Sequence, residues 1–387
     1  MNTAILNKHT LHLNGLEIPS IEYGDPRVLS KEPLVSVAMI TYNHEDYIGQ
    51  AIEHVAKQET SFPIELIIGE DCSTDRTRQL VFEYQKKYPC LIRIITSEEN
   101  VGARRNVLRT GVACRGKYIA YCEGDDYWHH PRKLQIQVDF LESNPNYGLV
   151  CSDARSYTVG TGTLLENAIP VRPHLCETDD PFLQLLTGVI LIWPLTVCMR
   201  RDLLQEILRE CPECSDESYL MGDTQCYLEV ARRAKIKFLP DVLATRNLLL
   251  ESATRSRDVQ RLARVAASQK RLIHHYLAKY PVPPDIDKQT RRWIALRGLY
   301  FAYVCRDWHK AVEEMSDLRA LNLAVPTKYQ LYYFGSRNLF TFRVVRIGLN
   351  ILAVCCTLRR SFIAACRRLI ASFSGNSFDR SSNQTQR

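Results

Sequence analysis

The sequence predicts an α/β protein with a doubly wound, mostly parallel β-sheet, helices on both faces of that sheet and a helical extension at the C-terminus. Three apolar runs, 34–40, 65–69 and 91–96, alternate with segments whose apolar residues recur at helical spacing. A run that is apolar at nearly every position is typical of a parallel strand covered on both faces. The chain has 387 residues, of which 45% are apolar, enough to bury the core of one large domain or two modest ones.

Each of the first two strands is followed by a polar loop and a helix. After the strand over 34–40, Asn43 is the predicted N-cap, because two acidic residues follow it and apolar residues then recur at helical spacing. After the strand over 65–69, Asp75 is the predicted N-cap of the second helix. Strands and helices that alternate through short links form a doubly wound sheet, in which ligands bind at the carboxyl ends of the strands.

A further strand over 118–122 ends on three acidic residues, Glu123, Asp125 and Asp126. Their mutual repulsion costs stability unless a cation offsets it. Glu123 and Asp125 are two residues apart, so both carboxylates point to the same side of an extended segment. Oxygen ligands at a strand end suit Mg²⁺ or Mn²⁺, which take their other ligands from water and a substrate diphosphate. Taken alone, the cluster also fits a solvated acidic turn before a helix near Pro131.

Polar loops at 41–43, 70–75 and 123–126 all follow predicted strands, and this shared position predicts one site. No Gly-x-Gly-x-x-Gly follows the first strand and no Gly-Lys-Ser/Thr run occurs in the chain, which disfavours a dinucleotide dehydrogenase or a P-loop kinase. The N-terminus lacks the basic start and apolar run of a secretory signal, so we expect a cytoplasmic protein. The 14 cysteines are expected to be reduced, and Cys211 and Cys214 lack the second pair of a structural zinc site.

Four segments in this order, 36–43, 70–75, 100–106 and 123–128, carry a specific resemblance to a known family. They read Ser-Val-Ala-Met-Ile-Thr-Tyr-Asn, Glu-Asp-Cys-Ser-Thr-Asp, Asn-Val-Gly-Ala-Arg-Arg-Asn and Glu-Gly-Asp-Asp-Tyr-Trp. Residues and spacing resemble family 2 glycosyltransferases of the GT-A fold over about residues 33–256, in particular bacterial enzymes that build cell-surface polysaccharides. The resemblance implies inverting, metal-dependent hexosyl transfer from a nucleotide-diphosphate sugar to a hydroxyl group of a glycan or lipid-linked glycan acceptor.

The resemblance also implies roles for residues that contact the donor. In this family the loop after the second strand binds the base and ribose, which gives Asp71 that role and, more loosely, Thr41 and Glu70. From the residues alone, Asp71 equally fits an Asx-turn. Arg104 lies in the segment that runs beside the diphosphate, where a guanidinium offers planar donors to phosphate oxygens. The alternative for Arg104 is a solvated charge at the start of a surface helix.

The family's Asp-x-Asp motif corresponds here to Glu123-Gly124-Asp125. The resemblance implies that Asp125 binds Mn²⁺ or Mg²⁺, that Glu123 faces the sugar or ribose, and that Asp126 supports the loop. Asp223 corresponds to the second acidic motif and is the predicted general base, although Asp is also a common helix N-cap. A single displacement needs no enzyme nucleophile.

Three further residues bear on the predicted site. Arg246 is predicted to meet phosphate, or alternatively to form a salt bridge between loops. Leu248 stands where related enzymes often have a histidine that reaches the metal or the diphosphate, and it cannot supply that ligand. Trp193 offers an aromatic platform for an acceptor sugar, although a buried position is commoner for tryptophan. The departures at Glu123 and Leu248 keep open a second hypothesis, an inactive GT-A domain that serves as a binding or scaffolding subunit of a polysaccharide assembly.

The chain is predicted to consist of a leader at 1–32, the glycosyltransferase domain at 33–256, a helical extension at 257–325, a basic apolar helical tail at 326–373 and a disordered end at 374–387. The formal net charge is +7, and no acidic residue occurs between Asp317 and Asp379. The tail fits either a peripheral amphipathic segment at the anionic inner face of the plasma membrane or a helix packed on its own domain. It lacks the interleaved aromatic residues of nucleic-acid binders, so no nucleic-acid partner is expected.

Overall fold

The structure is a computed structural model that describes residues 4–169, 180–220, 222–249 and 258–347. The chain divides into two compact units, residues 1–290 and residues 291–387. The part of the predicted tail beyond residue 347 and the predicted disordered end lie outside the described residues.

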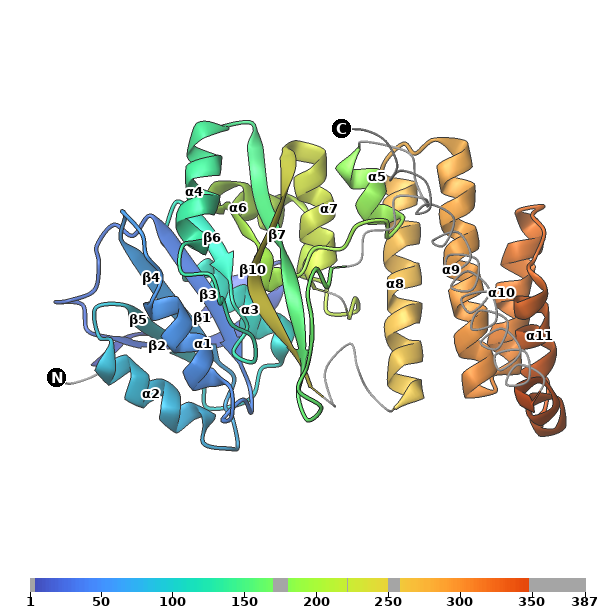
Figure 1. Cartoon of the computed structure of the whole chain (residues 1–387), viewed down its shortest axis with the longest axis horizontal. Coiled ribbons are helices and arrows are strands. Elements are labelled where there is room, and N and C mark those ends of the chain that lie inside the picture. The colour runs from blue at the N-terminus through green and yellow to red at the C-terminus, as the bar shows by residue number, and fades with distance from the viewer. Residues whose placement is uncertain (1–3, 170–179, 221, 250–257, 348–387) are drawn as a thin grey trace, which may run out of the picture. The chain divides into compact units, whose positions relative to one another are not determined.

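One mixed β-sheet forms the centre of the first unit (Figure 1), with the hydrogen-bonded order β1-β2-β5-β4-β3-β6-β9-β7-β10 and with β8 beside β7. The middle strands β5, β4, β3 and β6 are parallel, which confirms the predicted parallel arrangement at the centre of the sheet. The β1-β2 hairpin and β9 run antiparallel to their neighbours. The strands are β1 Ala4–Leu13, β2 Leu16–Gly24, β3 Val35–Thr41, β4 Ile64–Glu70, β5 Ile92–Thr96, β6 Tyr118–Tyr121, β7 Tyr147–Thr158, β8 Thr163–Leu165, β9 Cys198–Arg200 and β10 Lys235–Leu248.

Helices cover both faces of the sheet, as predicted. Val37 and Met39 of β3 point to one face and pack with residues of α1, α2 and α4. Ala38, which lies between them, points to the opposite face, whose core includes residues of α3, α6 and α7. This alternation follows from the two-residue period of a strand. The helices of the first unit are α1 Ile48–Ala56, α2 Thr77–Lys87, α3 Ala103–Val112, α4 Lys133–Ser143, α5 Pro181–Leu186, α6 Arg201–Glu210, α7 Asp223–Arg233 and α8 Val259–Lys279.

Residues 4–24 of the predicted leader form a β-hairpin, whereas no structure is predicted for the leader. β1 pairs with β2, and β2 pairs in turn with β5, so residues 4–24 extend the sheet. Asn14 and Gly15 form the turn, with φ values of 49° and 82°. Asn-Gly is the strongest short-range signal of a two-residue hairpin turn, because both residues tolerate positive φ. This dipeptide is the feature of the sequence that indicates the hairpin.

Asn43 does not cap a helix, so that prediction is wrong. α1 begins only at Ile48, and Asn43 has a φ of 55°. The Asn43 side chain instead pairs with Thr74, since Nδ2 donates to Thr74 Oγ1 at 3.1 Å and Oδ1 accepts the Thr74 N–H at 2.9 Å. It therefore joins the loop after β3 to the loop after β4. Asp75 precedes the cap position of α2 by one residue, and its Oδ1 accepts the N–H of Thr77 at 2.8 Å.

The second unit is helical. It includes most of α9, Pro284–Cys305, which begins before the boundary between the units, together with α10, Trp308–Ala320, and α11, Thr327–Gly335. Its buried core includes Leu299, Tyr303, Met315, Tyr332 and Val345. α8 belongs to the first unit, and the boundary between the two units falls after residue 290. Within the described ranges, no helix is both long enough and apolar enough to cross a membrane.

Candidate active site

The carboxyl ends of three neighbouring parallel strands bring the predicted polar loops together. Thr41 at the end of β3 pairs with Glu70 at the end of β4, and the Asp71 N–H donates to the Thr41 carbonyl oxygen at 3.1 Å. On the other side of β3, the Gly124 N–H donates to the Ile40 carbonyl oxygen at 2.9 Å. A Cβ atom at Gly124 would lie 2.7 Å from Thr41 Oγ1, so only glycine lets this loop approach β3 so closely. The three loops therefore lie side by side, as the sequence predicts.

Two predicted carboxylates, Asp125 and Asp223, lie close enough to act electrostatically on a third, Glu123, at this edge of the sheet. Burial raises the pKa of Glu123 to about 8, and the negative charges of Asp125 and Asp223 add to this effect while Arg246 opposes it. Burial also raises the pKa of Asp223 above its ordinary value, and nearby N–H groups and the positive charge of Arg104 oppose the rise. Such an excess of buried negative charge fits a site for a divalent cation, which would offset it.

Asn247 fixes the acidic loop to β10 through two hydrogen bonds. Its N–H donates to Asp126 Oδ1 at 2.8 Å, and its Nδ2 donates to the Asp125 carbonyl oxygen at 2.7 Å. The carboxylate of Asp126 is therefore used within the protein, which agrees with the expectation that it supports the loop. Nothing in the sequence marks Asn247 for this role, because it directly follows the equally polar Thr245 and Arg246. Leu248 itself is half-buried at the end of β10.

Glu70 is completely buried and is used by protein donors. Its Oε1 accepts the N–H of Ser73 at 2.6 Å, and its Oε2 accepts the hydroxyl of Thr96 at 2.9 Å. Arg78 Nε also lies 3.3 Å from Oε2. Glu70 thus closes the loop after β4 onto the end of β5, and its predicted contact with the nucleotide stays a prediction.

Asp71 holds the loop that precedes α3. Its Oδ1 accepts the Val101 N–H at 2.9 Å, and its Oδ2 accepts the Gly102 N–H at 3.0 Å. Arg109 Nη2 lies 3.3 Å from Oδ1 and forms a buried ion pair with this carboxylate. Burial raises the pKa of Asp71, and these three partners oppose the rise. Both carboxylate oxygens are therefore engaged by the protein, and a contact between Asp71 and a nucleotide base stays a prediction.

Arg104 lies beside the start of α7. Its Nη2 donates to the carbonyl oxygens of Glu213 at 3.4 Å and of Asp216 at 3.3 Å. Its Nη1 lies so close to Gly222 that a Cβ atom there would overlap it. The structure thus brings Arg104 to the residues that precede Asp223.

Arg246 and Trp193 contact each other near Glu123. The Arg246 guanidinium lies 4.9 Å from the centre of the Trp193 ring, which is a cation–π contact. Both side chains are half-buried, and the charge of Arg246 acts on Glu123. Trp193 is therefore part of the same region, with one face of its ring used by Arg246.

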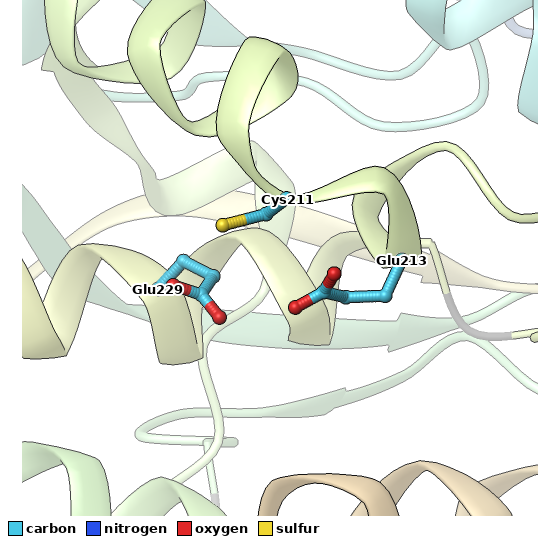
Figure 2. A group of neighbouring side chains, drawn as sticks. All are labelled: Cys211, Glu213 and Glu229. Carbon is cyan, nitrogen blue, oxygen red and sulfur yellow. The ribbon is translucent and has the colours of Figure 1, made fainter. Parts of the chain in front are cut away.

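Another group of ligand-type side chains lies outside this site. Among the residues that the structure describes, Cys211, Glu213 and Glu229 bring ligand atoms within 4.8 Å of one another, and Figure 2 shows them pointing toward a common centre. Lys279 Nζ lies 2.5 Å from Glu213 Oε1, 2.7 Å from Glu229 Oε1 and 3.7 Å from Cys211 Sγ. Arg233 forms a second ion pair with Glu229. The positive charge at this centre is therefore supplied by side chains, and the network joins α8 to α7.

A mixed sheet with a parallel centre and helices on both faces is the arrangement of the GT-A fold, which the solved structure described below shares. Residues 36–208 match the family model described as Glycosyl transferase family 2. This part of the chain is therefore a family 2 glycosyltransferase domain, which confirms the resemblance found in the sequence.

Relatives and solved structures agree with this assignment. Rv1520 of Mycobacterium tuberculosis, an uncharacterized protein, is 45% identical over 111 residues, which are 29% of this chain and 32% of the relative. TuaG of Bacillus subtilis, named for teichuronic acid biosynthesis, is 32% identical over 168 residues, which are 42% of this chain and 62% of the relative. The chain thus spans less than two thirds of the length of both relatives. The structure of Staphylococcus aureus TarS 1-349 in complex with UDP-GlcNAc is similar in fold, with a TM-score of 0.55 and 16% identity over 82% of this chain and 91% of that chain.

Proposed function

We propose that this protein is an inverting glycosyltransferase, which moves a sugar from a nucleotide-diphosphate sugar to a hydroxyl group of a glycan or lipid-linked glycan during the synthesis of a surface polysaccharide. The observation that carries the proposal is the electrostatic effect of Asp125 and Asp223 on Glu123, with Arg246 beside them, at the carboxyl ends of the strands. The family 2 match and a relative named for teichuronic acid biosynthesis support this class of reaction.

In the proposed reaction, the oxygen atom of the acceptor hydroxyl attacks the anomeric carbon while the bond from that carbon to the diphosphate oxygen breaks. Asp223 accepts the proton of the acceptor hydroxyl. Burial raises the pKa of Asp223, which brings it closer to the pH at which a general base works best. One attack from one side inverts the anomeric configuration, so no side chain of this chain forms a covalent intermediate.

Asp125 is the residue that we propose to bind a divalent cation, Mn²⁺ or Mg²⁺. The surroundings fit such an ion, because burial and the nearby charges of Asp125 and Asp223 raise the pKa of Glu123 and the charge of Arg246 opposes them only in part. A bound ion supplies positive charge that stabilises the departing nucleoside diphosphate. Glu123 is then available to hydrogen-bond the sugar or ribose, and Arg246 to contact phosphate.

The nucleotide is proposed to lie against the loop formed by Thr41, Glu70 and Asp71. Since the Asp71 carboxylate holds two backbone N–H groups of the next loop, it is placed to shape the surface that receives the base and ribose. Trp193 is proposed to face the acceptor, because its ring lies next to Arg246 at the edge of the same site.

Thermal melting in the presence of nucleotide sugars tests the proposal. UDP-, GDP- and TDP-linked sugars are added one at a time with MnCl₂, MgCl₂ or EDTA. We expect at least one donor to raise Tm only when metal is present. At roughly 100-fold excess over its Kd, the donor should stabilise the folded protein by about 2.7 kcal/mol. The release of nucleoside diphosphate from that donor, with cell-envelope glycans as acceptor, then measures transfer. No stabilisation by any donor would overturn the proposal, whereas stabilisation without any release favours an inactive scaffolding subunit.

We further propose that the enzyme works at an anionic membrane surface through a basic apolar face, which we define as Arg337, Leu339, Phe340, Arg343, Val344, Arg346 and Ile347. Phe340 and Ile347 are 74% and 61% exposed, and the three arginines are exposed as well. On the opposite side of the same segment, Val345 is buried against the aromatic core of the second unit. The segment therefore packs on its own unit along one side and presents apolar and cationic side chains along the other. This combination fits an anionic lipid surface.

Sedimentation with lipid vesicles tests this proposal about the membrane. We expect the full chain to sediment with vesicles that contain phosphatidylglycerol and to stay in solution with pure phosphatidylcholine. F340S/I347S should weaken the binding, because it removes the most exposed apolar side chains. V312S is the matched control, since Val312 is 42% exposed on α10 but lies outside the face. Equal sedimentation of the double variant and the wild type would exclude this face as the membrane-binding surface. If the wild type forms a dimer that the double variant does not form, the face instead makes contacts between copies of the chain.

A further inference from the structure

The segment that leads into Asp223 depends on polar contacts for its position. We define the base loop as residues 212–220. Its outer side borders an open groove of about 600 Å³, whose lining includes Asp216, Glu217, Tyr219 and His275. Cys214 near the start of the base loop packs into the core, whereas residues 216–220 are largely exposed, so the position of this second half depends mainly on hydrogen bonds.

Two helices hold the base loop, one that precedes it in the sequence and one that follows it. From α8, Ser268 Oγ accepts the N–H of Leu220 at 2.8 Å. From α3, Arg105 makes a bidentate pair with Glu217, in which Nε and Nη2 each donate at 2.8 Å. Bidentate pairs of this kind fix geometry as well as distance. The base loop is therefore held from both α8 and α3.

Arg104, the neighbour of Arg105 on α3, reaches further along the loop toward Asp223. Its Nη2 donates to the carbonyl oxygens of Glu213 and Asp216, and its Nη1 lies against Gly222. One guanidinium thus contacts the first half of the base loop and Gly222, which lies beyond the end of the loop. Its positive charge also acts on the Asp223 carboxylate.

α3 is itself fixed by the loop that is proposed to receive the nucleotide. The Asp71 carboxylate accepts the N–H groups of Val101 and Gly102, directly before the first residue of α3. Arg104 is therefore two residues away from a segment that Asp71 holds. A continuous set of contacts runs from Asp71 through the start of α3 to Gly222.

We propose that Arg104 is a positioning residue, which acts through Asp223 by fixing the base loop and the start of α7 rather than by binding the donor diphosphate. This inference rests on the proposed glycosyl transfer, in which Asp223 must face the acceptor hydroxyl. A Cβ atom at Gly222 would overlap Nη1 of Arg104, so a side chain at that position would displace the Arg104 guanidinium. Gly222 has a φ of −88°, which alanine adopts without strain, so alanine at this position acts on Arg104 and not on the backbone.

Gly222→Ala tests the proposal because it moves Arg104 without altering its charge. With the donor found by thermal melting, we expect G222A and R104Q each to lower kcat by roughly 10- to 100-fold, since small misplacements at a reacting centre cost about that much. The donor KM should stay within a few-fold of the wild-type value. The double variant should lose no more than R104Q alone, because both changes remove the same contact. G111A is the matched control, as a Cβ atom at Gly111 in α3 meets nothing within 4 Å.

Hydrogen exchange gives a second measurement that does not need an active enzyme. Amides of the base loop should exchange faster in R104Q and G222A than in the wild type and G111A, and R104K should restore the slow exchange only in part, because lysine cannot span two carbonyl groups. Wild-type kcat and unchanged exchange in both variants would overturn the proposal. A raised donor KM with unchanged kcat and unchanged exchange would instead assign Arg104 to the diphosphate. Absence of any turnover in the wild type counts against the proposed function, and exchange then decides the role of Arg104 alone.

Discussion

Replacing Asp223 with asparagine removes the proposed general base while it keeps the shape of the side chain. Asp223 is the first residue of α7, and its Oδ1 accepts the N–H of Thr224 at 2.8 Å. The amide oxygen of asparagine can accept the same hydrogen bond, so the start of the helix should be preserved. What is lost is the ability to take up the proton of the acceptor hydroxyl. This step contributes about 10²- to 10⁴-fold to turnover, which corresponds to about 2.7–5.4 kcal/mol of activation free energy.

The release of nucleoside diphosphate at saturating donor measures this loss. D202N is the matched control, because Asp202 also lies in the first turn of a helix and its Oδ1 accepts the N–H of Leu203 at 2.8 Å. We expect D223N to lose turnover while Tm and the donor-induced rise in Tm stay unchanged, and D202N to retain all three. Turnover of D223N within a few-fold of the wild type would refute the assignment of Asp223 as the base.

Two further changes test the support of the site and the charge balance of the core. N247A removes the hydrogen bond from Nδ2 to the Asp125 carbonyl oxygen. We expect it to lower the free energy of unfolding in urea by about 1–3 kcal/mol and to reduce the rise in Tm on addition of MnCl₂. An unchanged unfolding free energy together with an unchanged rise in Tm would show that Asn247 does not hold the acidic loop. Lys133 is completely buried with its ammonium 4.2 Å from the centre of the Trp128 ring, and burial lowers its pKa to about 8. Because the unfolded chain holds this proton more tightly, the wild type should gain stability relative to K133M as the pH rises from about 8 toward 10.5. Urea midpoints of both proteins across this range measure the difference, and a difference that does not change with pH would contradict the reasoning.

The central strands and the edge that carries the site could be predicted because their signals are local. The predicted strands over 34–40 and 118–122 correspond to β3, Val35–Thr41, and β6, Tyr118–Tyr121. An apolar run of this length and pattern has few ways to be buried other than as a central parallel strand. Once two such strands share a sheet, their carboxyl ends meet at one edge, which brings the residues that follow them together.

The details that could not be predicted depend on partners that are distant in the sequence. Asn43 has the local features of an N-cap, yet its side chain is taken by Thr74, which lies 31 residues away. Arg104 contacts carbonyl groups that lie 109 and 112 residues further along the chain. Asn247 meets Asp125 across 122 residues. Local propensity contains no information about such contacts, so the role of Arg104 beside Asp223 emerges only from the folded chain.

α8 belongs to the first unit, although the family model ends at residue 208. Lys279 of α8 pairs with both Glu213 and Glu229, whose side chains are only 7% and 0% exposed. Removing Lys279 leaves Glu213 without its ammonium partner, while Glu229 keeps its ion pair with Arg233. Loss of one partner of a buried ion pair costs up to about 3–5 kcal/mol. That cost is a large part of the roughly 5–15 kcal/mol that stabilises an ordinary domain.

We therefore predict that a chain that ends at residue 256 unfolds at a much lower temperature than one that ends at residue 283, directly before α9. Lys279→Met in the full chain should reproduce most of this loss without any truncation, and Lys117→Met is its control, because Lys117 pairs with Glu142 at the surface of the same unit. The pKa of Glu229 is lowered to about 2 by Lys279 and Arg233 despite burial, so this stabilisation should be present at neutral pH and be lost as the pH falls toward 2. Equal melting temperatures of the two truncated chains would show that α8 does not stabilise the first unit.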